Sequence, residues 1–313
     1  MAQVLHDAPL RGVLLAAGAA VAFSVNDLAI KFLSAGYALH QLMLIRAGIA
    51  LSLILSLAAA RPGGMAGLLP RRPAEQLLRA LVILVSNICF YTGLAVMPFA
   101  DAVAVGFVSP LILVLLSVLF LGERIGPRRW SAILIGFLGV VVMLRPGAGA
   151  LQPAALLVLA SAFLYALGYL MTRHMRGSES ALGLSVWMQV AFILTSGAMG
   201  ICFGEGRFEA GGTMFSFLLR PWIWPPPEDW PWFVLAGLSV AIGSVMITQA
   251  FRLAEAGLVA PMEYIGMPMA IFWGLAVFGT WPDAVAWAGI ALICGSGLYM
   301  IWRETRPRRK ENP

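Results

Sequence analysis

Long apolar runs separated by short charged connectors constrain the fold of this chain most strongly. The 313 residues are 60% hydrophobic and only 12% charged, whereas about a quarter of the residues of a soluble domain are charged. A helix that crosses a bilayer needs roughly 20 apolar residues. We therefore predict an all-α integral membrane protein. Its ten predicted transmembrane helices cover residues 12–33, 41–59, 77–97, 102–121, 129–144, 153–174, 181–203, 230–251, 257–279 and 284–302.

The distribution of lysine and arginine predicts the orientation of these helices, because cytoplasmic loops are enriched in both residues. With the N-terminus inside, 16 of the 21 lysines and arginines fall at inner connectors and tails, and four fall at outer ones. We predict that both termini are cytoplasmic, in a cell membrane of the bacterial inner-membrane type. The first apolar run has no obvious cleavage site, so we interpret it as a retained helix rather than a signal peptide.

Residues 94–146 share a plan with a segment that lies 157 positions further along the chain. Both segments contain an apolar run, a glycine break, a tryptophan and a helix rich in small residues. Gly122 aligns with Gly279 in this register. Such self-similarity indicates an internal repeat.

The repeat predicts two five-helix units, residues 1–147 and residues 148–313. Five is an odd number, so the second unit must enter the membrane upside down relative to the first. Inverted repeats are typical of secondary transporters, whose substrate site lies between the repeats near the middle of the membrane. We therefore expect a small-molecule transporter that works by alternating access.

A charged knot, Leu121 to Arg124, follows Pro110, and Arg46 stands early in the second predicted helix. Together with the ten helices in two halves, these features resemble the EamA branch of the drug/metabolite transporter superfamily. The resemblance covers nearly the whole chain and is clearest in residues 94–146. The second half departs from it, because Gly279-Thr280-Trp281 replaces the knot and carries no acidic residue. The resemblance implies a basket of helices from both halves around a central cavity, with the fifth and tenth helices packed at the periphery.

The family resemblance implies substrates among amino acids, nucleotide-like metabolites, vitamins and drugs, moved inward by some members and outward by others. The aromatic and amide residues described below favour import of a vitamin-like or nucleoside-like compound. Export of amino acids or drugs is the alternative. We expect transport to be proton-coupled or to proceed by exchange.

Ionisable residues within predicted spans are candidate gating or coupling sites, because a charge in the bilayer is costly. Asp27 and Lys31 stand four positions apart on one face of the first helix. Arg46 lies at similar depth in the second helix. We predict an Asp27–Arg46 or an Asp27–Lys31 pair, acting as an outer gate or substrate contact, or else as a structural ion pair.

Glu263 is the other carboxylate within a predicted span, and its equivalent in the first half is Gly106. A low-dielectric setting favours the protonated form of a carboxylate, which a proton-coupled carrier could use. We therefore consider Glu263 a coupling or substrate-binding residue. The alternative is an ion pair with Arg252 or Arg79 at the inner rim of the cavity.

Neutral polar side chains at mid-depth are expected to turn inward, because buried amides and hydroxyls need partners. Asn87 with Tyr91, and Tyr165 with Tyr169, each stand four positions apart on one helix. Such faces suit a flat substrate held by stacking and hydrogen bonds, although hydrogen bonding between helices would explain them equally well. The candidate substrate-binding residues are Asn26, Asn87, Tyr91, Ser109, Tyr165, Tyr169, Gln249 and Tyr264.

Other classes of protein are disfavoured. The sequence has neither an H-E-x-x-H motif nor a Gly-x-Ser-x-Gly elbow nor a Cys/His cluster, so we predict no catalytic residues, no metal and no cofactor. The net charge of +6 is spread over connectors and does not indicate nucleic-acid binding. A channel remains a remote alternative. We expect the lipid bilayer and a small molecule as partners, and the small-residue helices leave a homodimer open.

Overall fold

A computed structural model describes residues 2–60, 65–121, 126–144, 153–208, 215–254 and 259–304. Every regular element in these ranges is helical. The charged knot at Gly122 to Arg124 lies outside the described residues. The helices are α1 (Ala2–Leu33), α2 (Leu39–Ala59), η1 (Ala66–Leu68), α3 (Pro73–Val96), α4 (Phe99–Gly106), α5 (Ser109–Leu121), α6 (Pro127–Leu144), α7 (Pro153–His174), η2 (Met175–Gly177), α8 (Ala181–Phe203), α9 (Ser216–Leu219), α10 (Trp230–Leu253), η3 (Ala260–Ile265), α12 (Gly266–Phe278) and α13 (Ala284–Glu304).

Seven helical segments within the described ranges are long and apolar enough to cross a membrane. They correspond to the first four predicted spans and to the sixth, seventh and eighth. The other three predicted spans fall on shorter apolar helices of 10–17 residues, within α6, across η3 and α12, and within α13. The part of the chain that the structure describes is therefore all-helical, as in a multi-pass membrane protein.

Two of the predicted spans are broken rather than continuous. The span predicted at 102–121 begins earlier, at Phe99, and divides into α4 and α5. Proline has no N–H to donate, and its ring clashes with the carbonyl four residues before it. That carbonyl belongs to Gly106 for Pro110, and α4 ends there. Pro268 acts in the same way on Tyr264, and a 3₁₀ segment replaces the α-helix before Gly266.

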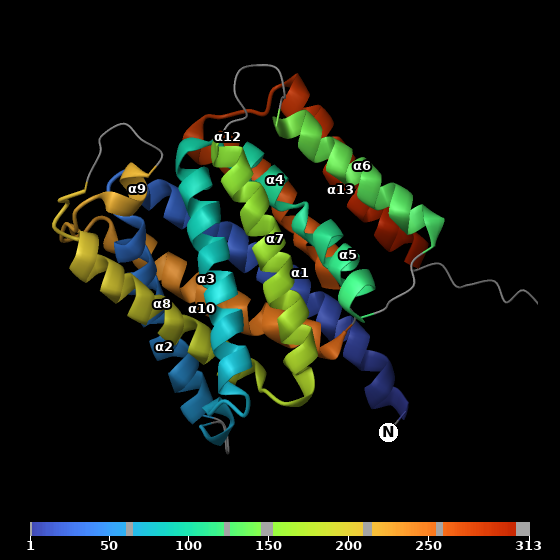
Figure 1. Cartoon of the computed structure of the whole chain (residues 1–313), viewed down its shortest axis with the longest axis horizontal. Helices are drawn as coiled ribbons and strands as arrows, with labels where there is room; N and C mark the ends of the chain where they lie inside the picture. The colour runs from blue at the N-terminus through green and yellow to red at the C-terminus, as the bar shows by residue number, and fades with distance from the viewer. Residues whose placement is uncertain are drawn as a thin grey trace, which may run out of the picture.

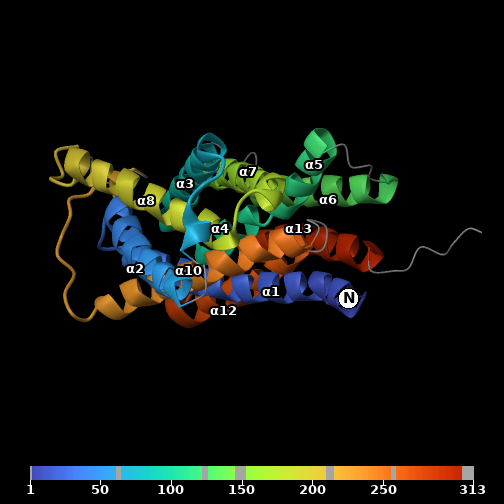
Figure 2. The ribbon, with the colours of Figure 1, turned by 90° about the horizontal axis from the view of Figure 1, so that it is seen from below.

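Figure 1 labels the helices, which form two layers that Figure 2 shows one above the other. One layer contains α3, α5, α6, α7 and α8, and the other contains α1, α2, α10, α12 and α13. Within the layers α1 packs on α10 and α3 packs on α7, while α2–α8, α4–α12 and α6–α13 are contacts between layers. The largest buried cluster joins α1, α2, α3 and α4 to α7, α8, α10 and α12.

The outer faces of several helices carry large exposed apolar side chains, including Leu119, Phe120, Leu134, Leu194 and Phe272. Apolar surface on this scale is unusual in a water-soluble monomer. It is the surface expected of helices that face lipid.

Small residues allow α6 and α13 to approach each other closely. A Cβ atom added at Gly136 would lie 2.7 Å from Ser296 Oγ, and one at Gly139 would lie 2.8 Å from Ile293 Cγ1. Gly136 and Gly139 therefore pack against α13 of the same chain. Gly295 on α13 has open space around it instead.

Candidate functional site

A cavity lies between the two layers, near the middle of the helix bundle. Its volume is about 170 Å³, and one water molecule takes about 10–15 Å³ on the same measure. The cavity therefore has room for a small organic molecule. Eight aromatic side chains line its wall, namely Phe23, Phe90, Phe99, Phe107, Phe192, Tyr91, Tyr165 and Tyr169. The polar lining residues are Ser24, Asn26, Asp27, Ser86, Asn87, Ser109, Ser161 and Glu263.

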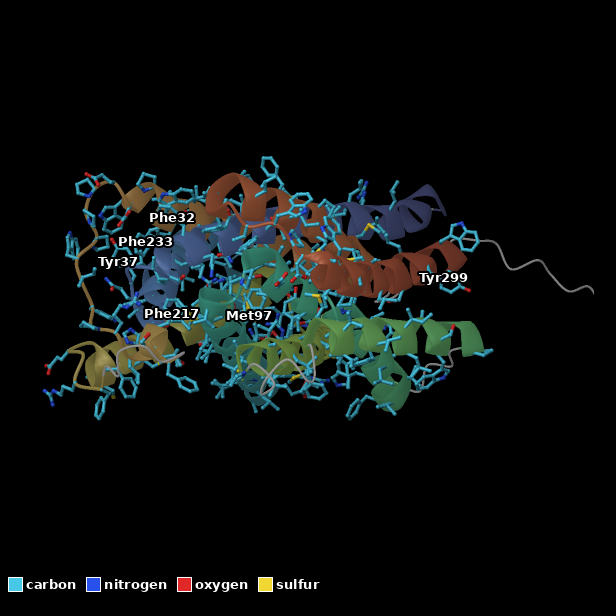
Figure 3. All side chains as sticks on the ribbon, turned by 90° about the horizontal axis from the view of Figure 1, so that it is seen from above. Phe32, Tyr37, Met97, Phe217, Phe233 and Tyr299 are labelled. Atoms are coloured by element: carbon cyan, nitrogen blue, oxygen red, sulfur yellow. The ribbon has the colours of Figure 1, made fainter. Side chains whose placement is uncertain are left out.

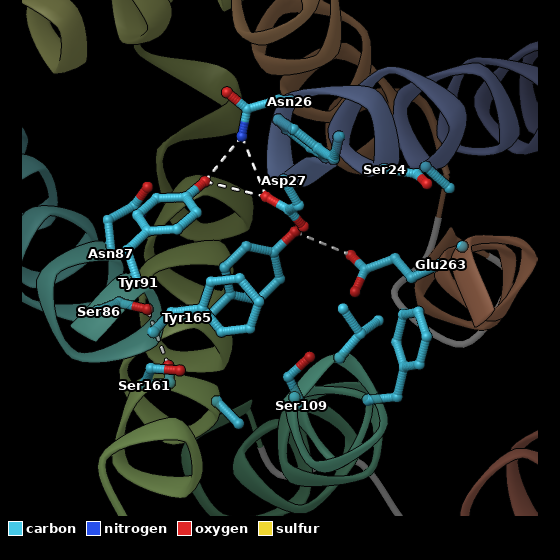
Figure 4. Close-up of a pocket in the computed structure, with 18 of the residues that line it drawn as sticks. Ser24, Asn26, Asp27, Ser86, Asn87, Tyr91, Ser109, Ser161, Tyr165 and Glu263 are labelled. Carbon is cyan, nitrogen blue, oxygen red and sulfur yellow. Dashed lines mark hydrogen bonds between the residues drawn. The ribbon is translucent and has the colours of Figure 1, made fainter. Parts of the chain in front are cut away.

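Asp27 on α1 stands at the centre of a hydrogen-bonded cluster at one wall of the cavity (Figure 4). Asn26 Nδ2 donates to Asp27 Oδ1 at 3.0 Å, and the Tyr91 hydroxyl donates to the same oxygen at 3.0 Å. Asn26 Nδ2 also donates to the Tyr91 oxygen at 2.7 Å. The sequence-predicted residues Asn26, Asp27 and Tyr91 thus form one unit, which joins α1 to α3.

Arg46 on α2 lies directly behind this cluster and is only 1% exposed. Its Nη1 atom lies 3.3 Å from both Asn26 Oδ1 and the Tyr91 oxygen. The guanidinium also faces the rings of Tyr91 and Phe192, at 5.5 and 5.3 Å from their centroids. Arg46 therefore does not contact Asp27 directly, contrary to the prediction. Asn26 and Tyr91 lie between them and hydrogen-bond to both.

Lys31 does not contact Asp27, although the two share a helix face. Its Nζ atom donates to the carbonyl oxygens of Leu94, Ala95 and Met97 at 2.6, 2.9 and 2.9 Å. These carbonyls end α3, where the helix leaves acceptors without intrahelical partners. The ammonium group has three donors and uses them all to cap α3. Lys31 is also absent from the cavity wall.

Glu263 on η3 faces the same cavity, and its carboxylate lies beside the Tyr165 hydroxyl (Figure 4). The Tyr165 hydroxyl donates to Glu263 Oε1 at 3.4 Å, and Glu263 forms no ion pair with another described residue. Arg79, a predicted alternative partner, donates instead to Thr172 Oγ1 at 2.6 Å and to the Leu184 carbonyl. The alternative in which Glu263 pairs with Arg79 or Arg252 at the rim is therefore wrong for this structure.

The remaining predicted residues divide into two groups. Asn87, Ser109 and Tyr169 line the cavity. Gln249 on α10 is half-buried and lies outside the lining. Tyr264 also lies outside it, because its ring packs on Phe107 and fills the space beside Gly297.

Sequence reasoning missed several lining residues. Ser24 accepts a hydrogen bond from Trp273 Nε1 at 3.0 Å, and Ser86 Oγ donates to the Ser161 carbonyl at 2.8 Å. Ser86 stands one position before Asn87, which the sequence did single out. The phenylalanines carry no polar signal, and only a prediction of the helix faces could have found them. Among the described residues, no group of three or more His, Cys, Asp or Glu side chains is placed to hold a metal ion.

The arrangement can bind a compound that combines flat apolar surface with hydrogen-bond donors. Ligand pockets are mostly apolar and aromatic, with a few polar groups that orient the ligand. Here the aromatic side chains supply stacking surface, and the carboxylates of Asp27 and Glu263 supply acceptors.

Comparisons with known proteins agree with this arrangement. Residues 10–145 match the model of the EamA-like transporter family. The chain is 31% identical over 247 residues to a protein named riboflavin transporter from Rhizobium johnstonii, covering 79% of this chain and 76% of the relative. It is 24% identical over 286 residues to an S-adenosylmethionine uptake transporter of Rickettsia prowazekii, covering 91% and 90%. It is 28% identical over 284 residues to the pseudopaline exporter CntI of Pseudomonas aeruginosa, covering 90% and 93%.

The fold also has a counterpart of known structure. A solved crystal structure superposes with a TM-score of 0.70 at 20% identity, and the match covers 96% of this chain and 98% of the other. The helix arrangement is therefore shared over the whole length. The chain belongs to the EamA-like transporter family of the drug/metabolite transporter superfamily, and it is a multi-pass membrane transporter.

Proposed function

We propose that this protein is a secondary active transporter that imports a flat, vitamin-like or nucleoside-like metabolite, with riboflavin as the leading candidate. The observation that carries the proposal is the central cavity, whose wall combines eight aromatic side chains with the two carboxylates Asp27 and Glu263. Riboflavin combines a flat ring system with N–H and hydroxyl donors, which match these two elements. The relative named riboflavin transporter supports the same choice.

An inverted repeat would explain why both halves contribute to the cavity. In the 157-residue register, Ser109 at the start of α5 corresponds to Gly266 at the start of α12. The two helix breaks therefore fall at equivalent positions. Phe107 and Tyr264, which are equivalent in that register, also lie in ring contact at 5.7 Å.

The helix contacts support the same repeat. Under the proposed correspondence α1, α2, α3, α4–α5 and α6 match α7, α8, α10, η3–α12 and α13. By this correspondence the α1–α10 contact is equivalent to the α7–α3 contact. Both contacts are among the most extensive in the molecule. In each of the pairs α2–α8, α4–α12 and α6–α13, the two helices in contact are equivalent to each other. A twofold relation between residues 1–147 and 148–313 accounts for this pattern.

The connectors gather at two ends of the bundle, as alternating spans require. Arg220 donates to the carbonyls of Ser34 and Ala35, which joins the α8–α10 connector to the α1–α2 connector. At the other end Glu179 accepts from the backbone N–H groups of Arg71 and Arg72. Figure 3 places Phe32, Tyr37, Phe217 and Phe233 at the first end and Tyr299 at the opposite one. We call the end at which Glu179 contacts Arg71 and Arg72 the arginine-bearing end. We assign this end to the cytoplasm, with both termini there and the protein in the inner membrane.

Export is the second candidate, because a relative of similar length is named an exporter. The same cavity would serve either direction. Vesicles of known orientation, supplied with riboflavin from one side at a time, distinguish the two directions by the side from which accumulation starts.

Purified protein in liposomes provides the direct test. We expect labelled riboflavin outside to enter faster when unlabelled riboflavin is loaded inside, because a carrier exchanges substrate across the membrane. A channel would show no such counterflow. Riboflavin should also raise the melting temperature of the protein, since a ligand that binds the folded state stabilises it by mass action. If riboflavin leaves both counterflow and melting temperature unchanged while another metabolite alters them, the substrate assignment is wrong.

A further inference from the structure

The two carboxylates of the cavity differ in how they are held. Asp27 Oδ1 accepts two hydrogen bonds at 3.0 Å, from Asn26 and Tyr91. Both donors contact the buried Arg46 guanidinium on their far side. Within the described ranges Glu263 accepts a single side-chain hydrogen bond, at 3.4 Å, from the Tyr165 hydroxyl. From this asymmetry, and resting on the proposed function, we propose that Asp27 is the fixed acceptor that binds the substrate, whereas Glu263 carries the coupling proton.

The partners of Asp27 favour its ionised form. An amide NH₂ group can only donate, so Asn26 Nδ2 suits a carboxylate oxygen that accepts. The positive charge of Arg46 behind Asn26 and Tyr91 adds to this preference. The second oxygen of Asp27 has no hydrogen-bond partner among the described residues and belongs to a side chain that lines the cavity. It is therefore free to accept an N–H or O–H donor from a bound substrate.

The partner of Glu263 suits both protonation states. A tyrosine hydroxyl donates to an ionised carboxylate and accepts from a protonated one, so Tyr165 can stay in contact when the proton arrives or leaves. No cation pairs with Glu263 to hold it in the charged form, among the residues that the structure describes. The titratable groups around it are Tyr165 and Tyr169 on α7, Tyr264 on η3, Asp27 on α1, and Cys294 on α13 next to Tyr264. Of these groups only Asp27 is a carboxylate like Glu263, and its Oδ1 atom already accepts hydrogen bonds from Asn26 and Tyr91.

The proposed cycle balances the proton. A proton from the outer solution binds a carboxylate oxygen of Glu263 when the cavity opens outward, and substrate binds at Asp27. After the cavity opens inward, Glu263 releases the proton to the inner solution and Asp27 releases the substrate. In the proposed cycle Asp27 keeps one protonation state throughout, so one proton enters with each substrate molecule.

Riboflavin binding and transport by three variants test this division. Glu263→Gln keeps a side chain of similar shape but cannot exchange a proton. We expect it to bind riboflavin and to perform counterflow, but to lose accumulation driven by an acidic outer solution. We expect Asp27→Asn to weaken riboflavin binding roughly 10-fold to 100-fold, the range typical of losing a hydrogen bond to a charged group. Glu205→Gln, at an exposed site far from the cavity, is the matched control and should behave as the wild type.

Each result decides one point. A wild-type protein that neither binds nor exchanges riboflavin contradicts the proposed function and not the division of roles. If the wild type transports riboflavin but ignores the pH gradient, or if Glu263→Gln still accumulates it under that gradient, the coupling role is wrong. Unchanged affinity in Asp27→Asn overturns the binding role. If Glu263→Gln fails to fold, Tyr165→Phe replaces it, and a pH profile of uptake identical to the wild type then counts against the proposal.

Discussion

At the scale of single residues, two charged side chains about one helical turn apart serve different purposes according to their neighbours. Asp27 and Lys31 share a helix face, yet Asp27 joins the cavity cluster whereas Lys31 caps α3. The sequence singles out both side chains because ionisable groups in apolar runs are rare. The partner of Lys31 could not be predicted, because backbone carbonyls at a helix end carry no sequence signal.

Lys31→Met should therefore lower stability and leave the cavity intact. The three carbonyls at the end of α3 would lose a charged donor, and we expect a loss of about 1.5–3 kcal/mol in the free energy of unfolding, as is typical of hydrogen bonds to charged groups. Urea unfolding in detergent measures this change, and Lys31→Arg, which keeps charge and donors, is the control. A variant of normal stability but with weakened riboflavin binding would instead assign Lys31 to the substrate site.

At the scale of helices, the sequence predicts where they lie better than which way they face. The apolar runs correspond closely to the helices. Two of the helices, α3 and α7, begin at a proline, Pro73 and Pro153, as is common in the first turn of a helix. A helix that is apolar all round gives no periodic signal for its inner face. Residue type alone therefore predicts Gln249 and Tyr264 in the cavity, and in the structure both lie outside its lining. Asn26, Tyr91 and Tyr165 are brought together by packing between helices far apart in sequence.

The α6–α13 contact gives a prediction at this scale. A Cβ atom at Gly139 would lie 2.8 Å from both Ile293 Cγ1 and Leu292 Cβ, so Gly139→Ala forces the two helices apart. We expect a loss of about 1–3 kcal/mol in stability, as for other overpacked sites. Gly295→Ala on α13 meets nothing within 4 Å and should be neutral or stabilising by about 0.4–1 kcal/mol. Thermal unfolding of both variants decides this, and equal melting temperatures would contradict close packing of α6 on α13.

At the scale of the whole molecule, the two halves meet at both ends of the bundle as well as around the cavity. Ser180 Oγ donates to the Gly67 carbonyl at the arginine-bearing end, and α4 packs on α12 towards the other end. Alternating access requires that these two sets of contacts open in turn. The sequence could suggest such a cycle from the repeat, but it could not identify the pairs that hold each end closed.

Two engineered disulfides test the cycle, one for each end. The Cβ atoms would lie 3.8 Å apart for Gly67→Cys with Ser180→Cys, and 3.9 Å apart for Ala100→Cys with Gly274→Cys. Both distances fall within the range of about 3.5–4.5 Å found in disulfides. With the native cysteines replaced by serine, we expect either cross-link to stop riboflavin counterflow and a reducing agent to restore it.

Binding separates this mechanism from a simple loss of folding. A transporter locked at one end should still bind riboflavin from the other end, so the thermal stabilisation by riboflavin should persist in each oxidised variant. The single-cysteine variants, treated with the same oxidant, should transport normally. Rapid counterflow in either cross-linked protein would mean that this end need not open during transport, and a rigid pore or a different moving element would then have to replace alternating access between the two halves.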